Sequence, residues 1–198
     1  QYAPAIAQAA AQVGSAQIRA KGTIGGNLAN ASPAGDSFPV LAALGATIIT
    51  ATPSGDSRSI PVEELVVRPG KTCLQVDECI TEIRLPVAGG TCSGFFKSVP
   101  RCAQALAKLS VAIALKIDEQ VITGARVALG AVGPRVMRVE NAEQFLIGRP
   151  VDSPGVDDIV SASVEAATPI DDFRATRDYR VRMIEVGIRR IMTEILTR

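Results

Sequence analysis

The 198-residue sequence contains no histidine. Ser-His-Asp and Cys-His catalytic arrangements need an imidazole to take the proton of the nucleophile. Triad-type hydrolysis is therefore excluded for this chain acting alone. No pairing of an acid with a base in the sequence argues for substrate chemistry of another kind.

Closely spaced cysteines are also missing. The four cysteines, Cys73, Cys79, Cys92 and Cys102, stand 6, 13 and 10 positions apart, and none forms a C-x-x-C pair. Zinc and iron–sulfur sites take paired, close ligands. We therefore expect no metal site in this chain, and reduced thiols in or near its core.

The sequence further shows no long apolar run, no visible signal peptide and no excess of charge. No stretch reaches the roughly 18 apolar residues of a membrane span, and no basic segment followed by an apolar one opens the chain. Lysine plus arginine number 21 against 20 for aspartate plus glutamate, which gives no electrostatic case for nucleic acid or an acidic membrane. We expect a soluble, cytoplasmic protein without nucleic-acid partner or membrane insertion.

The first half of the chain combines short helices with β-rich segments. Helices are predicted at 4–13, 37–44 and 61–65, and strands at 46–51, 57–60 and 79–85. Residues 14–21 are predicted to be extended and to lead into a glycine-rich loop at 22–27. Asp36 or Ser37 is the expected cap of the helix that Gly45 ends.

The second half changes character. Strands are predicted at 94–99, 109–117, 124–132 and 135–139, with a helix start as an alternative at 103–108. Residues 118–120 join the two longest strands. Helices are predicted at about 141–147, 156–167 and from 171 or 178 to 196. The last has the clearest period, with one apolar face made by Ile184, Ile188, Ile191, Met192 and Ile195. An antiparallel sheet with helices on one face follows, hence the α+β class.

The best domain boundary is the stretch Val87–Ser93, which contains Gly89-Gly90. We therefore predict one unit over residues 1–87 and a second over residues 88–198.

The stretch that carries most chemistry is Gly22-Thr23-Ile24-Gly25-Gly26-Asn27, followed by Ala31-Ser32-Pro33 and Asp36. Glycines let a backbone turn sharply and come within hydrogen-bond distance of a ligand. Such a loop suits a phosphate held by peptide N–H groups and a sugar hydroxyl held by a carboxylate. A plain turn, with Asp36 serving only as a helix cap, is the alternative.

These residues resemble the second flavin-binding loop of the molybdenum hydroxylase flavoproteins. That family comprises the FAD-carrying medium subunits or middle domains of xanthine dehydrogenase, aldehyde oxidase and carbon monoxide dehydrogenase. The likeness continues through Glu82-Ile83-Arg84-Leu85-Pro86 and Phe95-Phe96-Lys97 to Arg101 and Ala107-Lys108. It implies part of a two-subdomain FAD-binding domain of the vanillyl-alcohol-oxidase (PCMH) type, followed by a C-terminal antiparallel-sheet domain covered by helices.

The resemblance also implies a set of cofactor-binding residues. The loop that approaches the FAD pyrophosphate is matched by Thr23, Ile24, Gly25, Gly26 and Asn27. Asp36 matches an acid near the ribityl or phosphate region, and Ile80 matches an apolar contact. Lys97 matches a lysine near the isoalloxazine, where a cation stabilises a reduced, anionic flavin; an ordinary strand lysine is the alternative. For Arg101, a role at the site and a pairing with an acid both stay open.

The family carries an upstream segment with a first glycine-rich loop, which nothing in residues 1–21 resembles. We therefore expect this chain to match the latter two thirds of the flavoprotein. We also expect it to fold alone and to hold FAD weakly or not at all.

The implied function is an electron relay. A molybdopterin-containing large subunit would hydroxylate the substrate, a small subunit with 2Fe-2S clusters would pass electrons to FAD, and FAD would reduce NAD or another acceptor. Two alternatives remain: a truncated assembly module without flavin, and a stand-alone FAD oxidoreductase. The second would be favoured by a residue for covalent flavin attachment, and Cys79 lies in no clear motif of that kind.

Overall fold

The computed structural model describes residues 3–86, 89–101 and 104–197. The helices are α1 (Pro4–Ala11), α2 (Ala16–Lys21), α3 (Ile24–Ala29), α4 (Ser37–Ala43), α5 (Val62–Leu65), α6 (Glu140–Leu146), α7 (Val156–Ala166) and α8 (Arg177–Leu196). The strands are β1 (Thr47–Ala51), β2 (Ser57–Pro61), β3 (Val66–Arg68), β4 (Lys71–Thr72), β5 (Cys79–Arg84), β6 (Thr91–Ser98), β7 (Leu109–Asp118), β8 (Val121–Gly130) and β9 (Met137–Arg138).

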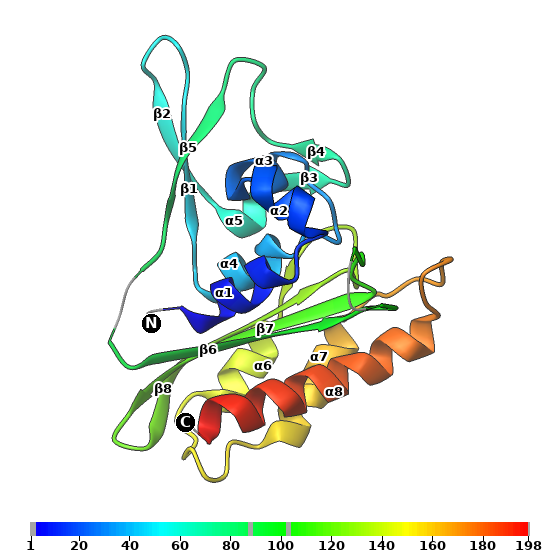
Figure 1. The fold of residues 1–198 in the computed structure, drawn as a ribbon. Helices are drawn as coiled ribbons and strands as arrows, with labels where there is room; N and C mark the ends of the chain where they lie inside the picture. Colours follow the sequence, from blue (N-terminus) through cyan, green and yellow to red (C-terminus); the bar gives the residue numbers. More distant parts are fainter. Residues whose placement is uncertain (1–2, 87–88, 102–103, 198) are drawn as a thin grey trace.

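Two antiparallel sheets organise the molecule. One has the strand order β2-β1-β5, and the other has the order β6-β7-β8-β9, with a small β3-β4 pair beside the first. Helices α6 to α8 lie below the β6–β9 sheet, whereas α1 and α4 lie above it, between the two sheets (Figure 1). The predicted α+β class is confirmed, but the larger sheet carries helices on both faces rather than on one.

The alternation of side chains along β7 and β8 explains why helices pack on both faces of the sheet. Successive side chains of a strand point to opposite faces. On β7, Val111, Ile113 and Leu115 join the core under α8, while Ala112 and Ala114 face α1 and α4. The sheet is therefore apolar on both faces, with large side chains on one and small ones on the other.

The core on the α1 and α4 side joins the two predicted units. It combines Leu28, Leu41 and Ile48 with Phe95 and Ala128, which lie beyond residue 88. The boundary at 87/88 stays a prediction. Val87 and Ala88 lie outside the described residues, Gly89 and Gly90 form a turn, and the last three residues of the predicted linker belong to β6.

Most strand and helix predictions are confirmed to within a few residues. The β7–β8 hairpin turns at Glu119 and Gln120, both with positive φ (46° and 63°), as a two-residue turn that follows the twist of its strands requires. Strand β8 begins at Val121 rather than at residue 124. The predicted apolar face of α8 is buried throughout. Residues 104–108 form no helix, and residue 103 of that alternative lies outside the described residues.

The segment before residue 30 differs from the prediction. Residues 16–21, predicted to be extended, form α2, because the Ser15 hydroxyl accepts the Ile18 N–H and alanine, glutamine, arginine and lysine are good helix formers. The predicted glycine loop is the start of another helix, α3. Leu28, fully buried, anchors that helix despite its two glycines.

Among the described residues, no helix combines the length and the apolar character that crossing a membrane requires.

Candidate functional site

The first turn of α3 is built by Thr23 and Gly26. The Thr23 hydroxyl accepts the Gly26 N–H at 3.0 Å, which caps the helix. A Cβ on Gly26 would lie 3.0 Å from that same hydroxyl oxygen, so glycine is what lets the cap close. The first N–H groups of a helix have no partner within it. With Gly26 capped, the N–H groups of Ile24 and Gly25 remain to receive an anion.

Gly25 and Ile80 meet across the gap between α3 and β5. A Cβ on Gly25 would stand 3.9 Å from the Ile80 side chain, which is partly buried against the core. Gly25 and Ile80, which the sequence predicts for one site, thus lie close together, and the apolar Ile80 side chain packs beside the start of α3.

Asp36 and Lys97 form a buried ion pair. The Lys97 ammonium lies 2.7 Å from Asp36 Oδ2, and the two side chains are only 1% and 8% exposed. The same ammonium donates to the Gln12 carbonyl at 2.9 Å, at the C-terminus of α1, where helix carbonyls carry partial negative charge. The positive charge of Lys97 is therefore compensated within the chain.

The position of Asp36 corrects the capping prediction. Asp36 does stand immediately before α4, but its side chain caps nothing there, because it is turned to Lys97. Burial raises the pKa of Asp36 above its ordinary 3.8, and the hydrogen bond and charge of Lys97 oppose that rise. Burying a carboxylate in this way is costly unless every oxygen finds a donor.

Two buried oxygens nearby lack such a donor. Asp36 Oδ1 and Asn27 Oδ1 accept no hydrogen bond from the described residues. Both lie around residues 35–36, since Asn27 Oδ1 is 3.3 Å from the place a Cβ on Gly35 would take. Buried acceptors without donors are rare in folded proteins and point to a missing hydrogen-bond donor.

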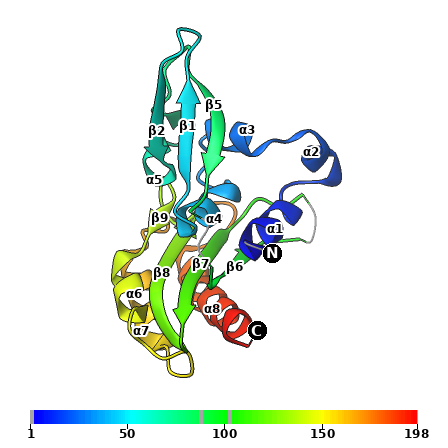
Figure 2. The ribbon, with the colours of Figure 1, turned by 90° about the vertical axis from the view of Figure 1, so that its left-hand side faces the viewer.

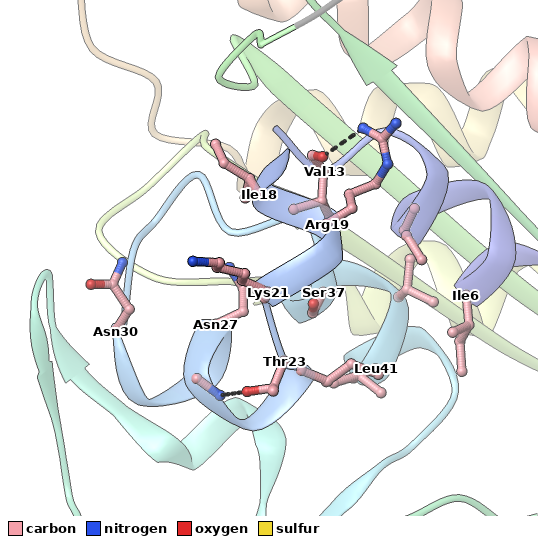
Figure 3. Close-up of a pocket in the computed structure, with 16 residues that line it drawn as sticks. Ile6, Val13, Ile18, Arg19, Lys21, Thr23, Asn27, Asn30, Ser37 and Leu41 are labelled. Atoms are coloured by element: carbon pink, nitrogen blue, oxygen red, sulfur yellow. Dashed lines mark hydrogen bonds between the residues drawn. The ribbon is translucent and has the colours of Figure 1, made fainter. Parts of the chain in front are cut away.

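A hollow of about 690 Å³ lies among the first four helices, here called the α1–α4 hollow. Its apolar wall comes largely from α1 and α4, with Ile6 and Leu41, and Lys21, Asn27 and Asn30 form a polar side opposite them (Figure 3). The remaining lining residues are Ala9, Ala10, Val13, Ile18, Arg19, Gly22, Thr23, Ile24, Gly26, Ser37 and Val40. An apolar wall facing a few polar groups is typical of cofactor sites.

A second hollow of about 520 Å³, the Lys97 hollow, lies between α1, α2 and the segment after β6. Lys97, Arg101 and Arg19 line it, and Arg19 also lines the α1–α4 hollow. Arg101 donates to the Gln104 carbonyl and pairs with no acid among the described residues. Of the two alternatives for Arg101, pairing with an acid is therefore not seen among the described residues.

The predicted site residues thus fall into three groups. Those that line the α1–α4 hollow are Thr23, Ile24, Gly26 and Asn27. Gly25 and Ile80 form the second group, and Asp36 and Lys97 the third. Phe96 does not join Lys97, because strand alternation turns its ring toward α8, where it meets Gly187.

Sequence reasoning missed the α1 wall of the hollow and the two cations of α2. A signal was present for the wall, because Ile6, Ala9, Ala10 and Val13 repeat at helical spacing on one face. Arg19 and Lys21 gave no signal of their own, since a basic residue near the end of an exposed helix is ordinary.

Two protein families match the chain and together cover nearly all of it. The family described as "FAD binding domain in molybdopterin dehydrogenase" matches residues 1–88. The family described as "CO dehydrogenase flavoprotein C-terminal domain" matches residues 94–195.

Curated proteins and a solved structure agree with these matches. The glyceraldehyde dehydrogenase medium chain of Sulfolobus acidocaldarius is 34% identical over 192 residues, which cover 97% of this chain and 68% of that protein. The caffeine dehydrogenase subunit beta of Pseudomonas sp. strain CBB1 is 32% identical, over 91% of this chain and 61% of that protein.

The structure of carbon monoxide dehydrogenase from Hydrogenophaga pseudoflava, in a form that lacks the Mo-pyranopterin moiety of the molybdenum cofactor, superposes with a TM-score of 0.91 at 27% identity. The superposition covers 98% of this chain and 67% of the chain it matches, so the protein spans about two thirds of its relatives' length. The chain belongs to the family of FAD-binding medium subunits of the molybdenum hydroxylases.

Proposed function

We propose that this chain holds FAD as the electron-transfer component of a molybdopterin-dependent dehydrogenase or hydroxylase. The observation that carries the proposal is the α1–α4 hollow, which lies wholly within the stretch matched by the FAD-binding family. Electrons would arrive from iron–sulfur clusters on a small subunit and leave to NAD or another acceptor. A large subunit with molybdopterin would carry out the substrate chemistry, and a cytoplasmic location stays a prediction.

The residues present fit FAD. The free N–H groups at the start of α3 and the hydroxyl of Thr23 suit a pyrophosphate, with Arg19 and Lys21 supplying positive charge. The unpartnered oxygen of Asn27, which lines the α1–α4 hollow, suits a hydroxyl donor of a sugar chain. The apolar wall of α1 and α4 would exclude water from the bound cofactor.

When bound, FAD supplies the one- and two-electron transfer that no side chain of this protein can perform. The chain's own contribution is binding and electrostatics. Lys97 lines the Lys97 hollow, and Asp36 with the Gln12 carbonyl fixes its ammonium in place. Because Asp36 compensates the charge, Lys97 would act mainly as an oriented hydrogen-bond donor.

Titration of FAD into the protein, followed by flavin fluorescence, tests the binding proposal. Gly26→Val should weaken binding at least tenfold, because the added side chain collides with the Thr23 cap and stands at the N–H groups of α3. Gly89→Val is the matched control, since a Cβ there meets nothing within 4 Å. Equal dissociation constants for the two variants would contradict the proposed site. A submicromolar constant for the unmodified 198-residue chain would contradict the prediction of weak binding.

The role of Lys97 is tested by the midpoint potential of the bound flavin. Lys97→Met should make the flavin harder to reduce, by at most about a kcal/mol, since the lysine charge is partly compensated. An unchanged potential would remove Lys97 from the site.

One observation favours the alternative of an assembly module without flavin. Asp36 and Lys97 form an ion pair, so the charges of both are compensated without a cofactor. The absorbance of flavin released by denaturing the purified protein tests this alternative, because an assembly module would release none and any released flavin would exclude it.

A further inference from the structure

Helices α6 and α7 have an unusual charge balance. The whole chain is nearly neutral, yet these two helices contain five carboxylates and neither lysine nor arginine. The carboxylates are Glu140, Glu143, Asp157, Asp158 and Glu165. Glu143 is taken by Arg138 and Asp157 by Arg189, which leaves three exposed carboxylates on this side of the molecule.

A groove of about 470 Å³ runs between the two helices, here called the α6–α7 groove. Its lining residues are Asn141, Gln144, Phe145, Asp158, Ser161, Ala162 and Glu165. On each helix these residues recur at spacings of three and four positions, so they lie on one face and form one ridge of side chains. Ala162 is small, so the α7 ridge leaves room opposite the ring of Phe145.

The groove has an apolar centre, Phe145, that the described residues leave about half exposed. Phe145 is 46% exposed, and Ile147, just past the end of α6, is 51% exposed. Half-exposed aromatic residues beside a concavity are typical anchors of protein interfaces. Helices α6 and α7 lie across the β6–β9 sheet from α1 and α4 (Figures 1 and 2), so the groove that they line is separate from the hollow proposed for FAD.

Carboxylates lie on the α7 side of that centre. Glu165 forms no ion pair with any residue that the structure describes. Asp158 meets only Arg149, at 3.5 Å, with the two side chains 52% and 46% exposed, and such a surface pair contributes little. Seven residues, or two helical turns, separate Asp158 from Glu165, about 10 Å along the axis. A partner helix with cations at the same spacing would match both.

We propose that the α6–α7 groove receives a basic amphipathic helix of a partner subunit, with an apolar side chain against Phe145 and lysine at Asp158 and Glu165. The proposal rests on the proposed function, which supplies the partner subunits. A second copy of this chain fits less well. In a two-fold contact through this groove, the same carboxylates would face each other and repel.

Zero-length carbodiimide cross-linking of the complex, purified with its partner subunits, tests the charge match directly. The reagent joins a carboxylate to a lysine that touches it. Peptides linking Asp158 or Glu165 to a lysine of another subunit are the expected result. Links to a second copy of this chain, or no links from these two carboxylates, would overturn the proposal.

Variants then test the apolar centre. Phe145→Ser should weaken subunit association at least tenfold, whereas Phe173→Ser, at a residue 95% exposed elsewhere on the surface, should leave it unchanged. Equal association of both variants would overturn the docking site. Flavin content is measured on the same samples. If Phe145→Ser loses its partner subunits but keeps its flavin, the docking site is supported. If the unmodified protein contains flavin but no partner subunit co-purifies with it, only the docking proposal is overturned. If the unmodified complex contains no flavin, the proposed function is overturned.

Discussion

The two faces of the β6–β9 sheet are covered by helices in very different ways. Under the sheet, α8 lays five large apolar side chains on Val111, Ile113 and Leu115, and the space is filled. Above it, the short helices α1 and α4 meet alanines of β7 and β8, and beside them remain the α1–α4 hollow and a buried ion pair.

The difference separates stability from ligand binding. Large branched side chains form a continuous buried core on the α8 side, and close-packed side chains leave little room for a ligand. On the other side alanines let helices approach closely, but polar groups and a hollow replace part of the core. One face of the sheet thus contributes mainly to stability, and the other borders the hollow that we propose for FAD.

The largest effect should come from breaking the ion pair on the hollow side. Lys97→Met leaves Asp36 buried without its charge partner, which typically costs about 3–5 kcal/mol. The double variant Asp36→Asn/Lys97→Met should be more stable than Lys97→Met, because it removes the unpaired charge. Chemical denaturation of the unmodified protein, the two single variants and the double variant measures this, and additive losses would show that the pair is not coupled.

Truncating one isoleucine on each face compares the filled and the hollow side. Ile113→Ala should cost about 2–5 kcal/mol, because Ile113 is fully buried and the cavity left behind cannot collapse. Ile6→Ala, at the wall of the hollow, should cost about 1 kcal/mol and weaken FAD binding instead. Thermal unfolding and FAD titration of both variants test the pair, and equal losses of stability would refute the contrast.

Glu78, a carboxylate away from the hollow, should lose its contribution to stability as pH falls. Hydrogen bonds from Arg58, with others from Thr50 and the Gln75 N–H, lower the pKa of Glu78 from 4.5 to about 2, although burial opposes the shift. Since the folded pKa is the lower one, the stabilisation is full above pH 4.5 and is lost as pH falls toward 2. Glu78→Gln should flatten the stability profile between these limits in denaturation at several pH values.

Asp36 should behave in the opposite direction. Its pKa is raised in the folded state, so folding favours its protonated form, and its contribution to stability declines as pH rises above the ordinary 3.8. Comparing the pH profiles of Asp36→Asn and Glu78→Gln isolates the two contributions. Changes of the same sign in both variants would contradict the assignment.

The smallest effect should follow from cutting the predicted linker. Limited proteolysis within residues 87–93 should yield two fragments that still elute together, because the core above the sheet contains residues from both sides of the cut. Separation of the fragments in size-exclusion chromatography without denaturant would mean that this shared core contributes little.

Sequence reasoning succeeded where one local pattern decides the structure. The face of α8 follows from isoleucines at helical spacing, and the β7–β8 hairpin from two apolar runs around a short polar turn. It failed at α2, where the serine cap before good helix formers went unread. Three glycines also suggested a loop at 22–27, but tertiary burial of Leu28 holds α3 as a helix.

The charge pairs of the site could not be read from the sequence. Asp36 and Lys97 are 61 positions apart, and no local rule joins them. The same holds for Arg180, a residue of the terminal helix that looks solvent-facing. It is 1% exposed, because it binds Asp172 and the carbonyls of Lys108 and Ala131. Such pairings depend on how distant strands and helices meet, which a single sequence does not encode locally.

The hydrogen bonds of α1 to distant parts of the chain also influence the order in which the protein folds. Gln8 accepts the Phe95 N–H and donates to Glu194, so the first helix is tied to a strand and to the last helix, 186 positions away. Contacts of such sequence separation form late, because a long loop must close first. During synthesis, α1 leaves the ribosome well before α8 but cannot take its final place until α8 has emerged. Pulse-labelled hydrogen exchange during refolding should therefore find the amides of α1 among the last to be protected, and the wall of the α1–α4 hollow would be completed only at that final step.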